Sequence, residues 1–153
     1  MSDGSRPVAH YVFNFSDGGA RQASALLQAK LWGVGPDERH RDALAPGDLA
    51  LIYVPAPEAE FIGRVELATA VREWTPAEAA AYPGDSRSGV MLAAVEEWHR
   101  GVSMRAVVQR IDPAGSNPLV QENAAAGFAS GVVLITGAEY EAAVALSRER
   151  RRT

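Results

Sequence analysis

Trp32 is the side chain with the clearest potential for binding chemistry, because Gly33 and Val34 follow it directly. A glycine beside a tryptophan leaves the ring open to close approach. Aromatic rings in such positions hold bases by stacking, which contributes about 1–3 kcal/mol per base. The alternative is a core tryptophan beneath a preceding helix, and the residue types alone slightly favour that alternative.

Polar groups must accompany a stacking ring, since stacking does not tell one base from another. Asn14 and Ser16 follow an apolar alternation and can offer an amide and a hydroxyl to a base edge. Tyr53 can add a second aromatic wall or its hydroxyl. Each also has a structural alternative, a turn-capping amide for Asn14 and a core ring for Tyr53, and the residue types do not decide between the two.

Arginines near such a pocket would contact the flanking phosphates, and the candidates are Arg39, Arg41 and Arg105. The formal net charge of −4 argues against a sequence-blind nucleic-acid binder, because nonspecific affinity comes mainly from phosphate neutralisation by a basic face. We therefore expect any nucleic-acid role to be local. An acidic domain of this kind would either rely on a partner protein or bind a free nucleoside.

Most other chemistries lack a motif. The chain has no cysteine, and its three histidines do not form a spaced pair, so no metal site is expected. Acidic residues 37–42 are expected to form a solvated face. The sequence contains no G-x-S-x-G elbow, P-loop or G-x-G-x-x-G fingerprint, so neither a cofactor nor a nucleotide is expected.

Lys30 offers the one enzymatic alternative. As the sole lysine, next to Leu31 and Trp32, it could act as a nucleophile or base if desolvated, with Glu58 or Glu60 as its partner. An exposed lysine that ends a helix, where its charge suits the helix dipole, is the more ordinary interpretation.

Apolar patterns predict the strands that must position these residues. Residues 10–15 alternate so that Tyr11, Phe13 and Phe15 share one face. Pro46-Gly47-Asp48 predicts a turn with positive φ at Gly47, which launches the next strand. The predicted strands cover residues 10–15, 49–54, 61–71, 89–96 and 132–135.

Helix signals separate these strands. Ser16 or Asp17 can cap a helix over residues 20–30, and two capping boxes, Thr75 with Glu78 and Thr136 with Glu139, start helices over residues 76–82 and 137–148. Residues 102–111 fit either a strand or a helix, and their spacing favours a helix. The remaining segments are predicted as a turn at residues 98–101, a loop at 113–118 and a flexible stretch at 124–130.

These elements predict a single α+β domain over residues 8–147, built on a curved or barrel-like sheet covered by short helices. Residues 1–7 are expected to be a disordered lead-in and residues 148–153 a basic tail. The N-terminus lacks an apolar leader and no apolar stretch approaches the ~20 residues that span a bilayer, so we expect a cytoplasmic protein.

The order of these segments resembles the EVE domain family of the PUA-like superfamily. The resemblance lies in the step WGV at residues 32–34, the Pro-Gly-Asp turn, the strand end IYV at 52–54, HYVFN at 10–14 and ITGAEYEAAVAL at 135–146. Related EVE and YTH domains place a tryptophan from this segment in a base-binding cage, so the resemblance favours a base pocket at Trp32.

The resemblance implies a non-enzymatic module that takes a modified base, such as a modified cytosine or adenine, from DNA rather than RNA into an aromatic-lined pocket. Such a base would be flipped out of the stack, at a cost of a few kcal/mol. The alternative, by analogy with the related ASCH domains, is a hydrolase that acts on a nucleoside or RNA through Lys30.

Overall fold

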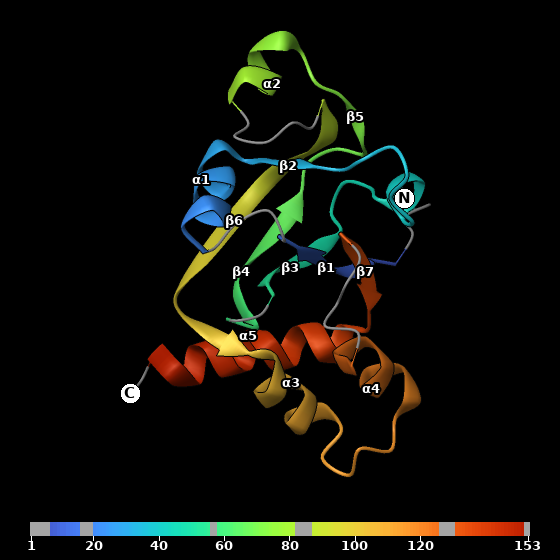
Figure 1. Ribbon diagram of the computed structural model, residues 1–153, viewed down its shortest axis with the longest axis vertical. Helices are drawn as coiled ribbons and strands as arrows, with labels where there is room; N and C mark the ends of the chain where they lie inside the picture. The colour runs from blue at the N-terminus through green and yellow to red at the C-terminus, as the bar shows by residue number, and fades with distance from the viewer. Residues whose placement is uncertain (1–6, 16–19, 56–57, 82–86, 126–130, 152–153) are drawn as a thin grey trace.

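Seven strands form one curled mixed sheet in the computed structural model (Figure 1). The structure describes residues 7–15, 20–55, 58–81, 87–125 and 131–151. The strand order is β2-β6-β4-β3-β1-β7, and β5 pairs with the start of β6 on the edge opposite to β2. The strands are β1 His10–Asn14, β2 Leu31–Gly33, β3 Leu49–Val54, β4 Glu60–Leu67, β5 Arg72–Glu73, β6 Ser88–Ser103 and β7 Val132–Ile135.

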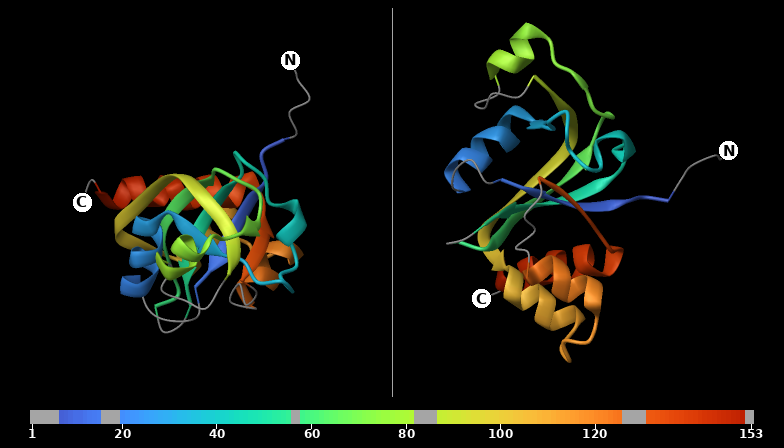
Figure 2. Two further views of the ribbon diagram at one scale, coloured as in Figure 1. Left: turned by 90° about the horizontal axis from the view of Figure 1, so that it is seen from above. Right: turned by 45° about the vertical axis from the view of Figure 1, so that its right-hand side comes forward.

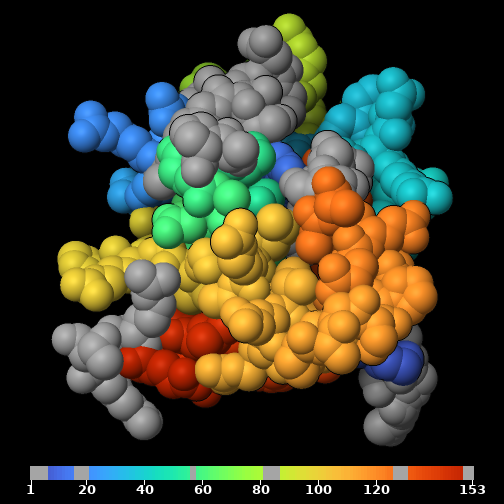
Figure 3. Space-filling model, turned by 60° about the horizontal axis from the view of Figure 1, so that its bottom comes forward, coloured from blue at the N-terminus to red at the C-terminus, as the bar shows by residue number. Residues whose placement is uncertain are grey.

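Helices cover both faces of this sheet. They are α1 Ala20–Ala29, the 3-10 helix η1 Arg41–Ala43, α2 Pro76–Ala81, α3 Met104–Ile111, α4 Pro118–Ala125 and α5 Gly137–Arg151. α1 and α2 lie on one side of the sheet, and α3, α4 and α5 lie on the other (Figure 2). Seen from below, α3, α4 and α5 sit side by side in one continuous surface (Figure 3). The predicted α+β fold with a curved sheet is confirmed.

Strand β3 lies inside the sheet and is apolar throughout because both of its faces are covered. Ala50, Ile52 and Val54 enter a core that β1, β2 and α1 complete, which we call the upper core. Leu51 and Tyr53 enter a second core against α3 and α5, the lower core. The predicted alternation in β1 is confirmed, since Tyr11, Phe13 and Phe15 all belong to the upper core.

The turn before β3 is formed as predicted. Gly47 has φ +89°, and the Asp48 amide donates to the Ala45 carbonyl across 3.1 Å. Asp48 itself is buried, and its carboxylate accepts hydrogen bonds from the amides of Ala9 and Ala45, at 3.1 Å each. The turn therefore holds the start of β3 against the residues that precede β1.

Both predicted capping boxes are confirmed. The Glu139 amide donates to Thr136 Oγ1 (3.1 Å), and the Thr136 amide donates to Glu139 Oε1 (3.0 Å). In the other box, the Glu78 amide donates to Thr75 Oγ1 (3.2 Å), and the Thr75 amide donates to Glu78 Oε1 (2.8 Å). The helix expected at residues 102–111 is also present as α3, with Ser103 as its cap.

The prediction of a turn at residues 98–101 is wrong, because β6 continues through them to Ser103. The pairing explains the error: Phe61 lies opposite Val102 and Gly63 opposite Glu97, so residues 98–101 of β6 face Ile62 alone. The turn-like residues form a large β-bulge that bends the strand without ending it.

Other elements and boundaries also differ from the prediction. Helix α4 was not predicted, although Asn117 caps it by accepting from the amides of Leu119 and Val120, and Pro118 occupies its first turn. Strand β4 ends at Leu67, before the predicted boundary, and α5 continues to Arg151, into the predicted tail. The Ser16 and Asp17 caps, residues 1–6 and residues 126–130 lie outside the described residues.

Candidate nucleic-acid interface

Trp32 lies in β2, and its ring packs against two aromatic rings from β1 and the residue after it. The ring centroids of Trp32 and Phe13 are 5.7 Å apart with the planes 22° from parallel, and Phe15 meets the Trp32 ring edge-on at 5.9 Å. The Trp32 residue is 3% exposed. The ring is therefore part of an aromatic stack in the upper core, and a base can reach it only after the side chains that cover it move.

The backbone after Trp32 is held tightly against the start of β6. The Val34 amide donates to the Ser88 carbonyl (3.0 Å), and Ser88 Oγ donates back to the Val34 carbonyl (3.0 Å). A Cβ at Gly89 would lie 2.1 Å from the Trp32 carbonyl oxygen, so only glycine fits there. Gly33 is half-buried and Val34 is buried, so this segment forms a rigid wall rather than an open loop.

Asn14 lies near this wall, at the end of β1. It is half-buried, and its backbone amide donates to the Gly131 carbonyl across 2.9 Å. Asn14 pairs with Tyr53 and alternates with Phe13, so its side chain lies on the face of the sheet opposite to Trp32. Ser16 lies outside the described residues. The structure therefore keeps Trp32, Gly33 and Val34 together, whereas the expectation that the Asn14 side chain bonds to a base stacked on Trp32 is corrected, because that side chain lies on the opposite face of the sheet.

Tyr53 does not join them. It belongs to the lower core, where its ring packs on Phe61 at 5.0 Å, while Trp32 belongs to the upper core on the other face of the sheet. Burial raises the pKa of the Tyr53 hydroxyl. The expectation that Tyr53 forms a second wall beside Trp32 is corrected, because two rings on opposite faces of a sheet cannot enclose one base.

The three candidate arginines lie in three different environments. Arg39 is exposed on the segment that follows Val34. Arg41 is turned inward, and its Nη1 donates to the carbonyls of Val34 (2.7 Å) and Gly35 (3.1 Å). Arg105 lies on α3, which covers the opposite side of the sheet. Of the three, Arg39 is the one that is exposed on the segment that follows Trp32 in the chain.

Lys30 cannot exchange a proton with Glu60. The Lys30 carbonyl accepts from the Leu92 amide, and Leu92 pairs with Leu67 at one end of the eight-residue strand β4. Glu60 is at the other end, roughly 20 Å away along a strand of this length. Glu58 is two residues further from Leu67 in the chain. The geometry therefore does not provide the expected catalytic pair.

Comparisons with known proteins identify the fold. No protein-family model matches the sequence, and no curated protein matches it. Human THYN1, solved in complex with DNA that contains 5-methylcytosine, is similar in structure with a TM-score of 0.62 at 14% identity, over 91% of this chain and 97% of THYN1. Protein Atu2648 from Agrobacterium tumefaciens gives 0.60 at 18% identity, over 92% and 93% of the two chains. ASCH from Zymomonas mobilis gives 0.54 at 13% identity, over 90% and 95%.

The chain has the PUA-like fold. The resemblance to EVE and ASCH domains that the sequence suggested is thus confirmed at the level of the fold. Sequence identities below 20% do not carry site residues across, so the candidate site of this chain rests on its own side chains.

Sequence reasoning missed several residues that build the wall at Trp32. Ser88 and Glu38 contribute hydrogen bonds to Val34 and Val132 respectively, and Arg41 was interpreted as a phosphate contact when it is a structural donor. The partnership of Phe13 and Phe15 with Trp32 had a visible signal in the β1 alternation, but only the β2–β6 pairing brings Trp32 to them. Ser88 carried no signal in the sequence.

A groove of about 640 Å³ lies away from this wall, beside the β6 bulge. It runs between the outer side of α1 and the ends of β4 and β6, where Ser24 Oγ donates to Glu97 Oε2 across 2.7 Å. Its lining residues include Arg21, Gln28, Glu60 and His99. Neither Lys30 nor Trp32 is among its lining residues, so the groove contains Glu60 without the lysine that the enzymatic alternative requires.

Within the described residues, no three histidine, cysteine, aspartate or glutamate side chains gather as they would around a metal ion. None of the described helices combines the length and apolar character needed to cross a membrane.

Proposed function

We propose that this chain is an EVE-type nucleic-acid-binding module that recognises a modified base, in DNA rather than RNA. The observation that carries the proposal is the Trp32–Phe13–Phe15 aromatic stack at one end of the curled sheet, in a fold shared with a protein solved on 5-methylcytosine DNA. A modified cytosine is accordingly the first base to test, and a modified adenine is the second.

Binding follows from the chemistry of these residues. An extruded base stacks on Trp32, while Ser16 bonds to its edge and the backbone of Gly33 and Val34 borders it. Arg39 contacts a flanking phosphate. Extrusion costs a few kcal/mol, which stacking and edge hydrogen bonds must recover. A methyl or similar substituent adds apolar contact area in such a pocket, which is how modified and plain bases would differ in affinity.

Charge supports a local mode of contact. The net charge of −4 gives the whole surface no general attraction for a polyanion, so affinity must come from the bound base and a small number of phosphates. A partner protein that supplies further phosphate contacts would complete such an interface.

The test compares the Trp32→Phe and Trp98→Phe variants with wild type. Trp32→Ala would leave a cavity in the upper core and cost about 3–5 kcal/mol of stability, so its binding result could not be interpreted. Trp32→Phe keeps an aromatic ring but reduces its stacking face, and we expect a loss of affinity of roughly fivefold, about 1 kcal/mol, for an oligonucleotide with one 5-methylcytosine. Trp98→Phe, a buried tryptophan of the lower core, is the matched control and should bind as wild type does.

Titrations at one fixed salt concentration, with methylated and plain DNA and RNA of the same sequence, complete the experiment. A wild-type chain that binds none of these ligands, or a folded Trp32→Phe variant with unchanged affinity for a ligand that wild type binds, would contradict the proposal. The catalytic pair that the hydrolase alternative requires is not formed, because Lys30 lies near the Leu67 end of β4 and Glu60 is at the other end.

A further inference from the structure

The segment between β2 and β3 reaches from one edge of the curled sheet toward the other. β2 and β7 end the strand order, so they are the two edges of the sheet. Residues 35–43, which we call the strap, leave β2 and cross to the side of the molecule where β7 lies (Figure 1). There Glu38 Oε2 accepts a hydrogen bond from the amide of Val132, the first residue of β7, across 3.1 Å. The gap between the two edges is thus bridged through a side chain.

Several hydrogen bonds hold the strap at its β2 side. Arg41 Nη1 donates to the carbonyls of Val34 (2.7 Å) and Gly35 (3.1 Å), and it lies 3.2 Å from Ser88 Oγ at the start of β6. Ser88 adds its own bond to the Val34 carbonyl. The β2 side therefore holds through several bonds, and at β7 the strap is held by the hydrogen bond from Val132 to a half-buried glutamate.

Gly131 makes room for that bond. A Cβ at this position would lie 2.4 Å from Glu38 Oε1 and 3.3 Å from Glu38 Cδ. The carboxylate thus occupies the space that any other residue at position 131 would fill. Because the obstructing atoms are the end of a flexible side chain, a methyl group there would displace the carboxylate without disturbing the strand.

The strap covers the core that contains Trp32. Val34 and Leu44, which flank the strap, are 1% and 2% exposed and belong to the upper core together with Tyr11 and Trp32. The His40 ring, within the strap, packs 5.9 Å from the Tyr11 ring. Opening the seam between the strap and β7 would therefore expose this side of the upper core.

We propose that Glu38 is a positioning residue that latches the strap to β7 and thereby controls access to Trp32. The role in base entry rests on the proposed function, but the latch itself does not. When the Glu38–Val132 bond breaks, the strap swings on its Arg41 and Ser88 anchors, and the route between the two sheet edges to the aromatic stack opens.

Acrylamide quenching of Trp32 fluorescence tests the latch without any nucleic acid. In a Trp74→Phe, Trp98→Phe background, Trp32 is the only tryptophan of the chain. Glu38→Ala and Gly131→Ala should each raise the quenching constant roughly fivefold, the factor that corresponds to one ordinary hydrogen bond. Glu38→Gln keeps an acceptor oxygen and should restore the wild-type value. Asp37→Ala, an exposed neighbour on the strap, is the matched control and should not change it.

Quenching in Glu38→Ala and Gly131→Ala that equals the wild-type value would overturn the latch, whether or not the chain binds DNA. If both variants raise quenching, the association rate with a 5-methylcytosine oligonucleotide should rise in the same order. An unchanged association rate in chains that bind would overturn the role of the latch in base access. Failure of the proposed function looks different, since wild type would then bind no modified oligonucleotide while the quenching results stand.

Discussion

Trp32 shows how one residue can serve both the fold and a binding site. Its ring is 3% exposed and stacks on Phe13, so it stabilises the upper core in the absence of a ligand. A residue that is already immobilised in an aromatic stack loses little conformational freedom when a base arrives, which favours binding. The cost of this arrangement is that access requires movement nearby, and Glu38 is the residue at which that movement is expected to begin.

Gly47 gives a prediction at the same scale. Its φ of +89° is unfavourable for residues with a side chain, and the turn it forms starts the central strand β3. Gly47→Val should therefore destabilise the chain by about 1–3 kcal/mol through backbone strain. Urea denaturation followed by circular dichroism measures this loss.

Gly35→Val is the control for Gly47→Val. A Cβ at Gly35 would meet no atom within 4 Å, and Gly35 does not have a positive φ, so we expect a change within about 0.5 kcal/mol. Equal stabilities for the two valine variants would show that the turn does not depend on the conformation of Gly47.

At the scale of elements, the β6 strand does the most to arrange the molecule. It pairs with β2, β4 and β5, and its bulge at residues 98–101 bends it between the upper and lower cores. Val90 and Leu92 belong to the upper core, whereas Trp98 and Val102 belong to the lower core. One strand thus links the aromatic stack to the α3–α5 layer.

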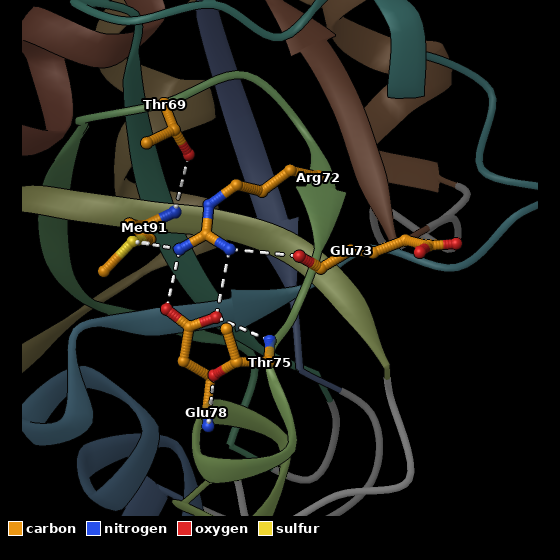
Figure 4. A network of polar contacts seen from close by, with 6 residues as sticks. All are labelled: Thr69, Arg72, Glu73, Thr75, Glu78 and Met91. Atoms are coloured by element: carbon orange, nitrogen blue, oxygen red, sulfur yellow. Dashed lines mark hydrogen bonds and ion pairs between the residues drawn. The ribbon is translucent and has the colours of Figure 1, made fainter.

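Helix α2 is attached to β5, which pairs with β6, by an ion pair whose pH dependence can be predicted. Arg72 donates to both carboxylate oxygens of Glu78, at 3.0 and 2.6 Å, and also contacts Met91 in β6 (Figure 4). The Arg72 guanidinium, together with the Thr75 amide, lowers the pKa of Glu78 from 4.5 to about 2. A lowered pKa in the folded state means that the contact stabilises α2 above pH 4.5 and is lost as the pH falls from 4.5 toward 2.

NMR titration of the Glu78 side chain and of the α2 amides measures this directly. We expect Glu78 to titrate near pH 2 in wild type and closer to 4.5 in Arg72→Met, which removes the guanidinium. The amides of α2 should lose protection over the same range. Arg110→Met, which removes an exposed ion pair with Glu149, is the control and should leave the Glu78 titration unchanged.

For the whole molecule, charge and the layer arrangement together limit how nucleic acid can approach. Arg39 and Arg105 lie on opposite sides of the sheet, so one short duplex segment cannot contact both while a base stacks on Trp32. The number of phosphate contacts per bound base should accordingly be small, and the affinity should depend only weakly on salt.

Salt titrations test this arrangement. Each phosphate contact contributes about 0.9 to the negative slope of log affinity against log salt, so Arg39→Ala should make the slope shallower by roughly that amount. Arg105→Ala, on the far layer, should leave both slope and affinity unchanged. A larger effect from Arg105→Ala than from Arg39→Ala would place the nucleic acid on the α3–α5 surface instead.

The sequence alone was sufficient where the determining contacts are local. The alternation of Tyr11, Phe13 and Phe15, the Gly47 turn and the capping boxes at Thr75 and Thr136 are all decided within a few residues, so their physical signals lie next to one another in the chain. The order of these local signals also carried the family resemblance, and the comparison with solved structures confirmed it at the level of the fold.

Only the tertiary structure decided which of the candidate residues meet. A period of two shows which residues of one strand share a face, but strand pairing across long connections decides which face of the sheet that is. This is why Trp32 and Tyr53 separate into two cores, and why Arg41 turns inward while Arg39 stays exposed. The Glu38–Val132 bond joins residues 94 positions apart, and no local pattern specifies a contact between the two edges of a curled sheet.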